Sequence, residues 1–192
     1  MARTRSRRTG LMLAVLLVLL TGVGVAWLTG FPRTHPSPEP GGPGVPSATA
    51  AGIPSRPDDA VALTVTYVFD GDTIEGADPS TGERTRVRLI GIDTPEGTPT
   101  PECWADEARA HLAELLPEGA TVWTAPDAEP RDRYDRSLRY LWTDDGRFVN
   151  YELVAAGDAA ALRIAPNTAH AELFAAAQTE AEASRAGRWG AC

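Results

Sequence analysis

The stretch VALTVTYVFDGDTIEGA, residues 61–77, alternates apolar and polar side chains and then turns on acids. Its period of two over nine residues predicts a β-strand over 61–69. One face of this strand would carry Val61, Leu63, Val65, Tyr67 and Phe69. The Asp-Gly-Asp sequence at 70–72 is typical of a turn, so a second strand is expected over 73–77.

Turn-forming residues at 78–82 separate this hairpin from a third apolar stretch over 84–92. Three strands joined by short turns predict an antiparallel meander. Thr100 and Pro101 are typical of an N-cap and a first helical position, so a helix is expected to start there. Its apolar residues recur at helical spacing as far as Leu115.

Four more elements are expected: strands over 120–125 and 137–143, and helices over 150–156 and 168–186. The order of three strands, a helix, two strands and further helices predicts an α+β domain over residues 58–192. We expect a five-stranded antiparallel barrel of the oligonucleotide-binding type (OB-fold) with about three helices. The domain is expected to be a monomer.

The N-terminal residues 1–31 are typical of a membrane segment. Four arginines fall within residues 3–8, and no charged side chain occurs from 11 to 31. Such a run can cross a bilayer as a helix, since about 20 residues at about 1.5 Å each span the hydrocarbon core. The arginines place the N-terminus inside and the remaining chain outside. The segment is predicted to be an uncleaved transmembrane anchor or, alternatively, a cleaved signal peptide, which leaves the domain at the cell membrane or secreted.

Residues 32–57 are rich in Pro, Gly, Ser and Thr and nearly free of large apolar side chains. Such a segment cannot bury enough surface to offset its ordering entropy, so a disordered linker is predicted. The folded domain then begins near Asp58.

Cys103 and Cys192 are the only cysteines in the sequence. An exported domain meets an oxidising environment, where a disulfide between them is expected. It would close a loop of about 90 residues, for which the loop-entropy account gives about 4–5 kcal/mol of stabilisation.

Acidic residues lie where two predicted strands end. Asp72 follows the first strand, and Asp93 and Glu96 end the segment RLIGIDTPE, residues 88–96. Each acid alone would be a solvated turn residue. Gathered at one edge of a sheet, however, carboxylates offer the hard oxygen ligands that Ca²⁺ prefers. The sequence therefore suggests a calcium site.

The predicted domain carries 12 arginines against 25 acids, a formal net charge of −13, which repels polyanions at long range. Guanidinium groups nevertheless bind phosphate oxygens bidentately. Surface salt bridges are the alternative role, above all for Arg131 and Arg133 in the segment RDRYDR. Five arginines could form a positive groove within the acidic surface: Arg84, Arg86, Arg88, Arg133 and Arg136.

Five motifs follow one another along the chain: FDGDTI, VRLIGIDTPE, RDRYDR, FVNYELVAAGDA and a final GRW. Together they resemble the staphylococcal nuclease-like (thermonuclease) family over residues 61–189. The resemblance implies a five-stranded oligonucleotide-binding barrel with three helices, and calcium-dependent hydrolysis of DNA and RNA.

The resemblance also implies a role for each acid. Asp72 and Asp93 match calcium-ligating carboxylates, and Thr94 matches the residue whose backbone carbonyl completes the protein ligands. Asp70 matches an acid in the outer shell of the metal. Glu96 matches the general base that takes a proton from the attacking water.

Arg88 and Arg136 match the arginines that bind the scissile phosphate, and Tyr134 matches a nucleotide-site tyrosine. Arg133, beside Tyr134, is also assigned to substrate binding. A divalent ion and two guanidinium groups suit a reaction that adds negative charge around phosphorus, because they stabilise the transition state more than the ground state.

The sequence departs from the family pattern in two places. Asp135 replaces a glycine, which adds a negative charge beside Arg136. Residues 158–168 lack the tyrosines that help to hold the nucleotide, and leave Leu162 and Ile164 there.

These features predict an extracellular calcium-dependent endonuclease that hydrolyses DNA and RNA and leaves 3′-phosphate ends. One alternative is a catalytically weak OB-fold module that binds nucleic acid or a protein at the cell surface. A second alternative is a calcium-binding structural domain without a role in nucleic-acid chemistry.

Overall fold

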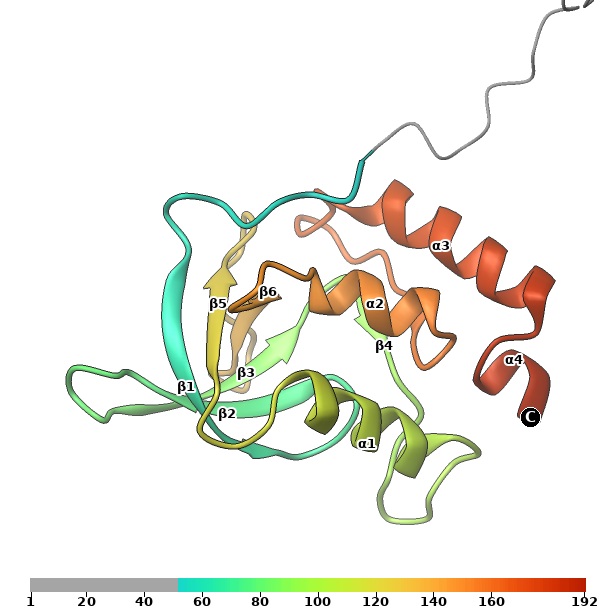
Figure 1. The fold of residues 1–192 in the computed structure, drawn as a ribbon, viewed down its shortest axis with the longest axis horizontal. Coiled ribbons are helices and arrows are strands. Elements are labelled where there is room, and N and C mark those ends of the chain that lie inside the picture. The colour runs from blue at the N-terminus through green and yellow to red at the C-terminus, as the bar shows by residue number, and fades with distance from the viewer. Residues whose placement is uncertain (1–51) are drawn as a thin grey trace, which may run out of the picture. The chain divides into compact units, whose positions relative to one another are not determined.

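The computed structural model describes residues 52–192 (Figure 1). Its strands are β1 (Val61–Val68), β2 (Thr73–Ala77), β3 (Arg84–Leu89), β4 (Ile92–Asp93), β5 (Thr121–Ala125), β6 (Ser137–Thr143) and β7 (Ala160–Ala161). Its helices are α1 (Ala105–Leu115), α2 (Val149–Ala155), α3 (Ala171–Ser184) and α4 (Arg188–Ala191). The domain is therefore α+β, as predicted.

Five strands close into a barrel in the order β1-β2-β3-β6-β5. The prediction of a wholly antiparallel barrel is wrong at one seam, because β3 and β6 pair in parallel, with Val87 opposite Ser137. Parallel neighbours need a long crossover, and here β4, α1 and β5 lie between the two strands in the sequence. The other four pairs are antiparallel.

The first strand contains a β-bulge that changes which side chains face the core. The pairing register with β2 shifts between Val65 and Tyr67. Val65 and Val68 are therefore both buried, whereas Tyr67 is 44% exposed. The prediction that Val65 and Tyr67 share a face is wrong, because a bulge inserts one residue and reverses the alternation beyond it.

The predicted third strand over 84–92 divides into two. β3 ends at Leu89, Gly91 adopts a left-handed φ of 81°, and β4 then pairs with β7 in a separate two-stranded sheet. A Cβ at Gly91 would lie 2.5 Å from the Phe174 ring. The turn therefore needs glycine both for its φ and for the close packing of α3.

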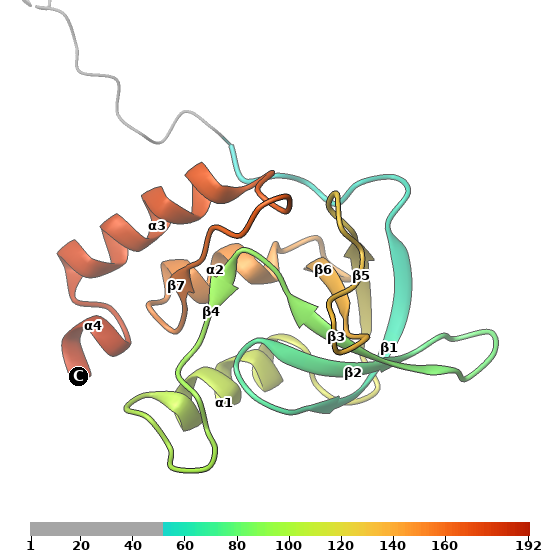
Figure 2. The same cartoon turned by 180° about the vertical axis from the view of Figure 1, so that it is seen from behind.

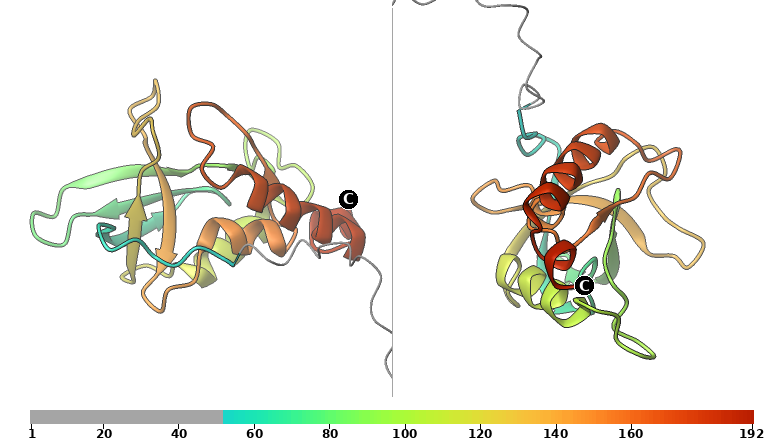
Figure 3. Two further views of the ribbon diagram at one scale, coloured as in Figure 1. Left: turned by 90° about the horizontal axis from the view of Figure 1, so that it is seen from above. Right: turned by 90° about the vertical axis from the view of Figure 1, so that its right-hand side faces the viewer.

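The helices gather at one end of the barrel, where α2 lies between the strands and α3 (Figures 1, 2 and 3). The buried Asn150 fixes α2 in this place. Its side-chain carbonyl accepts a hydrogen bond from the Leu141 N–H at 2.9 Å, and its NH₂ group donates to the Ile90 carbonyl at 2.9 Å. α2 is thereby tied to β6 and to the turn after β3.

The first helix starts at Ala105 rather than at Pro101, with Trp104 as its N-cap residue in a left-handed conformation. Tertiary contacts hold the preceding residues outside the helix. Cys103 forms the predicted disulfide with Cys192, and the Trp104 indole N–H donates to the buried Asp158 carboxylate at 2.7 Å. The N-cap signal at residues 100–101 is overridden by these long-range contacts.

His111 of α1 forms an ion pair with the other oxygen of Asp158. This hydrogen bond raises the pKa of His111, burial opposes the rise, and the charges of Asp158, Glu114 and Glu152 reinforce it. A raised folded-state pKa gives stabilisation that is complete below the unfolded pKa of about 6.5 and is lost as pH rises through the folded pKa.

We therefore expect the His111→Gln variant to lose more unfolding free energy at about pH 5.5 than at about pH 9. Urea unfolding of parent and variant at both pH values measures this difference. An equal loss at the two pH values would show that the imidazole acts by packing alone.

The disulfide between Cys103 and Cys192 joins the start of α1 to the end of the chain across a separation of 89 residues. Replacing both cysteines with serine should lower the free energy of unfolding by about 2–5 kcal/mol, because the unfolded chain gains the freedom of the open loop. Urea unfolding without reductant measures the loss. Adding a reductant to the parent should reproduce it, and a parent insensitive to reductant would contradict the expectation.

No helix within residues 52–192 is long and apolar enough to span a membrane. The predicted anchor at residues 1–31 and most of the predicted linker lie outside the described residues.

Candidate active site

Arg88 lies at the centre of a polar cluster near the end of β3. Its Nη2 atom is 3.0 Å from an oxygen of Asp72 and 3.1 Å from an oxygen of Asp93. Its Nη1 atom donates to the backbone carbonyls of Leu89 and Ile92. Because both carboxylates contact one nitrogen atom, the fold brings the acids of two separate strand ends to the same point.

Asp72 is the buried member of this cluster, with 6% of the residue exposed. Its Oδ2 atom accepts hydrogen bonds from the Thr94 backbone N–H at 3.1 Å and from the Thr94 hydroxyl at 3.0 Å. Burial raises the pKa of Asp72 to about 6, the Arg88 guanidinium opposes this, and the charge of Asp70 adds to it. A cation bound here would favour the ionised carboxylate.

The Asp-Gly-Asp turn positions the Asp72 carboxylate beside Arg88. The Asp70 carboxylate accepts the Asp72 backbone N–H at 3.0 Å, which closes the turn. A Cβ at Gly71 would lie 2.8–2.9 Å from side-chain atoms of Thr94 and Ala108. Only glycine lets this turn pack so closely against the Thr94 segment and α1.

Glu96 lies beyond β4, in the loop that leads to α1, and is exposed. Its backbone N–H donates to the Glu102 carboxylate at 3.0 Å, and its carbonyl accepts the Glu102 N–H at 2.9 Å. Within residues 52–192, no hydrogen bond or ion pair joins its own carboxylate to the Arg88 cluster. The fold therefore brings together Asp72, Asp93, Thr94 and Arg88, and leaves the Glu96 carboxylate free in solvent.

Arg136 is held by Asp132, a residue that the sequence reasoning missed. The Arg136 Nε atom donates to Asp132 at 2.7 Å, and its backbone N–H donates to the other carboxylate oxygen at 2.9 Å. Burial alone would raise the pKa of Asp132, but hydrogen bonds from Arg136 and Tyr134 lower it below its ordinary value. The available signal was the spacing of four residues between acid and arginine in RDRYDR.

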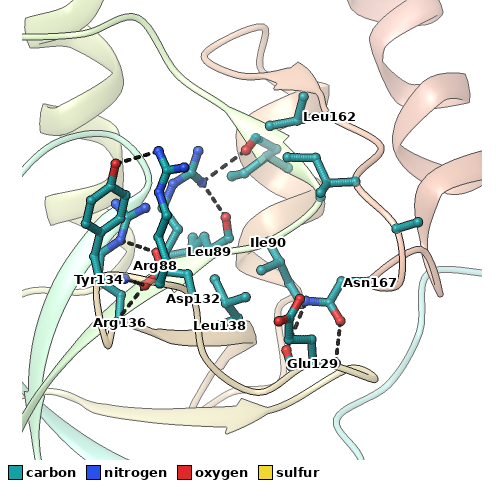
Figure 4. Close-up of a pocket in the computed structure, with 15 residues that line it drawn as sticks. Arg88, Leu89, Ile90, Glu129, Asp132, Tyr134, Arg136, Leu138, Leu162 and Asn167 are labelled. Carbon is teal, nitrogen blue, oxygen red and sulfur yellow. Dashed lines mark hydrogen bonds and ion pairs between the residues drawn. The ribbon is translucent and has the colours of Figure 1, made fainter.

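Arg88 and Arg136 line one pocket of about 440 Å³ (Figure 4). Tyr134 stands at its edge, 65% exposed, with its hydroxyl bonded to Arg133 at 2.6 Å. The remaining wall is largely apolar and includes Leu89, Ile90, Leu138, Leu162 and Ile164. The pocket thus combines two guanidinium groups with an apolar surface, which suits a phosphate attached to a flat ring.

Asn167, another residue missed from the sequence, fixes the rim of this pocket. Its side-chain carbonyl accepts the Glu129 N–H at 2.8 Å, and its NH₂ group donates to the Glu129 carbonyl at 3.0 Å. The segment before α3 is thereby fastened to the segment before β6.

The negative charge of Asp135 does not pair with the guanidinium of Arg136, although the two residues are neighbours in the sequence. It adopts a left-handed φ of 63°, which is the conformation that glycine takes without strain. Its carboxylate pairs with Arg131 at 2.9 Å rather than with Arg136. Arg131 therefore has the surface salt bridge that was its alternative role, whereas the guanidinium of Arg133 lies over the Tyr134 ring at 4.7 Å.

The donor set at the Arg88 cluster fits a hard cation only in part. No group of three or more His, Cys, Asp or Glu side chains within residues 52–192 could hold a metal ion. Two carboxylates converge on Arg88, Asp72 buried and Asp93 with a side chain 55% exposed, and the Thr94 backbone N–H and hydroxyl donate to Asp72. Calcium accepts such oxygen ligands and completes its coordination with water.

Comparison with known proteins agrees with this geometry. The family model described as staphylococcal nuclease homologue matches residues 86–191. The thermonuclease of Staphylococcus intermedius is 36% identical over 127 residues, which cover 65% of this chain and 74% of that protein. The thermonuclease of Staphylococcus hyicus is 33% identical over 65% of this chain and 73% of its own.

A longer relative contains the same domain. Endonuclease YhcR of Bacillus subtilis (strain 168) is 34% identical over 135 residues, which are 65% of this chain but 11% of that protein. The match therefore covers the barrel and its helices, which correspond to a small part of that longer protein. With its barrel, its acid and arginine cluster and these relatives, the chain belongs to the staphylococcal nuclease family.

Proposed function

We propose that this protein is a calcium-dependent endonuclease that hydrolyses phosphodiester bonds of DNA and RNA. Membership of the family makes the chain a hydrolase of the endonuclease type. The observation that carries the finer proposal is the position of Arg88, which contacts Asp72 and Asp93 and also lines a pocket with Arg136.

In the proposed mechanism the two arginines act on the substrate. Arg88 and Arg136 bind the non-bridging oxygens of the scissile phosphate and stabilise the charge that builds up as water attacks. Asp72, Asp93 and the Thr94 carbonyl would hold the calcium ion, which supplies further charge stabilisation when bound. The Glu96 carboxylate takes the proton of the attacking water, for which its exposed position leaves it free.

The atoms balance in one displacement. The water oxygen forms a bond to phosphorus, its proton passes to Glu96, and the bond from phosphorus to the 5′ oxygen breaks. The 5′ oxygen then takes a proton from solvent water, Glu96 releases its proton to solvent, and the phosphate remains on the 3′ side. Tyr134 and Arg133, at the edge of the pocket, bind the nucleotide beside the scissile bond.

An extracellular location is part of the proposal. It rests on the predicted membrane or signal segment at residues 1–31 and on the disulfide, which persists in oxidising compartments.

The experiment incubates the full chain with end-labelled single-stranded DNA in calcium and identifies the products. Internal cleavage that leaves 3′-phosphate ends is expected. Binding of the DNA without cleavage would favour the second candidate, a binding module, which the absence of tyrosines from residues 158–168 supports. Products with 5′-phosphate ends would contradict the proposed displacement.

A further inference from the structure

The outer face of the barrel beside the candidate site carries a row of stacked aromatic and arginine side chains. We call Tyr67, Phe69, Arg86 and Arg109 the arginine–aromatic track. The Arg86 guanidinium lies 4.1 Å from the Phe69 ring centroid, and that of Arg109 lies 5.9 Å from the Tyr67 centroid. The two rings meet edge to face at 4.9 Å. Four side chains from β1, β3, α1 and the turn after β1 thus form one surface.

The strand register makes this track continuous with the candidate site. Tyr67 lies opposite Glu75, and Glu75 lies opposite Arg86, so the three side chains share one face of β1, β2 and β3. Arg88 is two residues further along β3, on the same face and about 6.6 Å away along the strand. Arg86 also lines a surface hollow with Tyr134 and Arg136.

The charge of the track contrasts with the rest of the domain. Acids outnumber arginines about twofold in the folded part of the chain. Within residues 52–192, however, neither Arg86 nor Arg109 forms a salt bridge, and both lie over aromatic rings instead. The acid in the row, Glu75, is occupied by Arg84 at 2.9 Å and by the Thr66 hydroxyl at 2.8 Å. The track is therefore a cationic surface with an exposed ring, Tyr67.

We propose that the arginine–aromatic track binds single-stranded nucleic acid that continues from the scissile phosphate, with a base stacked on Tyr67 and the backbone on Arg86 and Arg109. The proposal rests on the proposed nuclease function, which places the strand at Arg88. Alternating cations and exposed aromatic rings are the chemistry that binds single strands, because unpaired bases offer π-faces and phosphates offer charge. A duplex keeps its bases stacked on one another, so it gains nothing from the Tyr67 ring.

The test compares two substrates on the full chain in calcium: a trinucleotide, which reaches little beyond the scissile bond, and a single strand of about 20 nucleotides. Removing a stacking ring costs about fivefold or more in affinity. The Tyr67→Ala variant should therefore raise KM for the long strand about fivefold or more, and leave its kcat and the trinucleotide kinetics unchanged. Tyr67→Phe should behave as the parent, because it keeps the ring.

The matched charge control is Arg147→Ala, in the turn between β6 and α2, for which parent-like KM values are expected. Arg86→Ala should raise KM for the long strand, as a second variant within the track. An unchanged KM for the long strand in Tyr67→Ala, or an equal rise in KM for a duplex of the same length, would overturn the proposal.

A binding measurement separates this proposal from the proposed function. Fluorescence anisotropy of the labelled single strand, recorded in excess chelator so that the strand stays intact, measures affinity apart from cleavage. If the parent binds the strand without cleaving it, and the Tyr67→Ala variant binds it more weakly, the arginine–aromatic track is supported and the nuclease function is rejected. If the parent cleaves the strand, and the Tyr67→Ala variant binds it with the same affinity as the parent, the track is rejected and the nuclease function is supported. A parent that neither binds nor cleaves rejects both.

Discussion

Replacing Glu96 with glutamine is expected to lower kcat for DNA cleavage by about two to four orders of magnitude, the range for losing a general base. The change keeps the shape of the side chain and removes only its ability to accept a proton. KM should change little, because Glu96 touches neither guanidinium group within the described residues. Single-turnover cleavage of labelled DNA measures the chemical step.

Because Glu96 is exposed, its substitution should change activity without changing the stability of the fold. Its carboxylate has no partner within residues 52–192, so the substitution should leave the urea midpoint at the parent value. Glu107→Gln, at an exposed position in the first turn of α1, is the matched control and should cleave as the parent does. A Glu96→Gln variant with parent-like kcat would assign the role of base to another group.

Replacing Arg88 with methionine is expected to reduce kcat by about two to three orders of magnitude and also to destabilise the fold. The loss of activity follows from removing a preorganised donor to the transition state. The loss of stability follows because Asp72, with a side chain 8% exposed, would be left buried without its ion-pair partner. Breaking a buried pair in this way costs about 3–5 kcal/mol.

A second substitution separates the two effects. The double variant Arg88→Met with Asp72→Asn removes both charges, so most of the lost stability should return while activity stays low. Urea unfolding and single-turnover cleavage of the parent, both single variants and the double variant complete the cycle. If the double variant were no more stable than Arg88→Met, the ion pair would not be the source of the instability.

Local patterns predicted the elements that carry the site. The alternation at residues 61–69 and the Asp-Gly-Asp turn indicated two neighbouring strands, and β2 and β6 have the predicted bounds. Because Thr73 of β2 lies opposite Arg88 of β3, the meeting of Asp72 with Arg88 follows from the meander. Asp93 lies on β4, outside the meander, and reaches Arg88 through the turn at Gly91. These predictions depended on nearest neighbours in the sequence, and short-range chemistry decides such features.

Contacts between residues far apart in the sequence determine the features of the fold that local patterns did not predict. The parallel pairing of β3 with β6 joins strands that α1 and β5 separate, and no local pattern encodes that choice. The late start of α1 depends on Asp158, which binds both Trp104 and His111 from another part of the chain. The sequence did not predict the bulge after Val65, because both β-branched and aromatic residues suit either face of a strand.

We propose that Asp72 and Asp93 hold a calcium ion on which phosphodiester cleavage depends, and a calcium titration of the cleavage rate measures that dependence. The full chain should cleave no DNA in excess chelator and should gain activity with added calcium. The Asp93→Asn variant should need at least about tenfold more calcium for half-maximal rate, since it loses a charged ligand. Cleavage that persists in chelator, or that has the same calcium requirement in both proteins, would show that these two acids do not hold a calcium ion needed for cleavage.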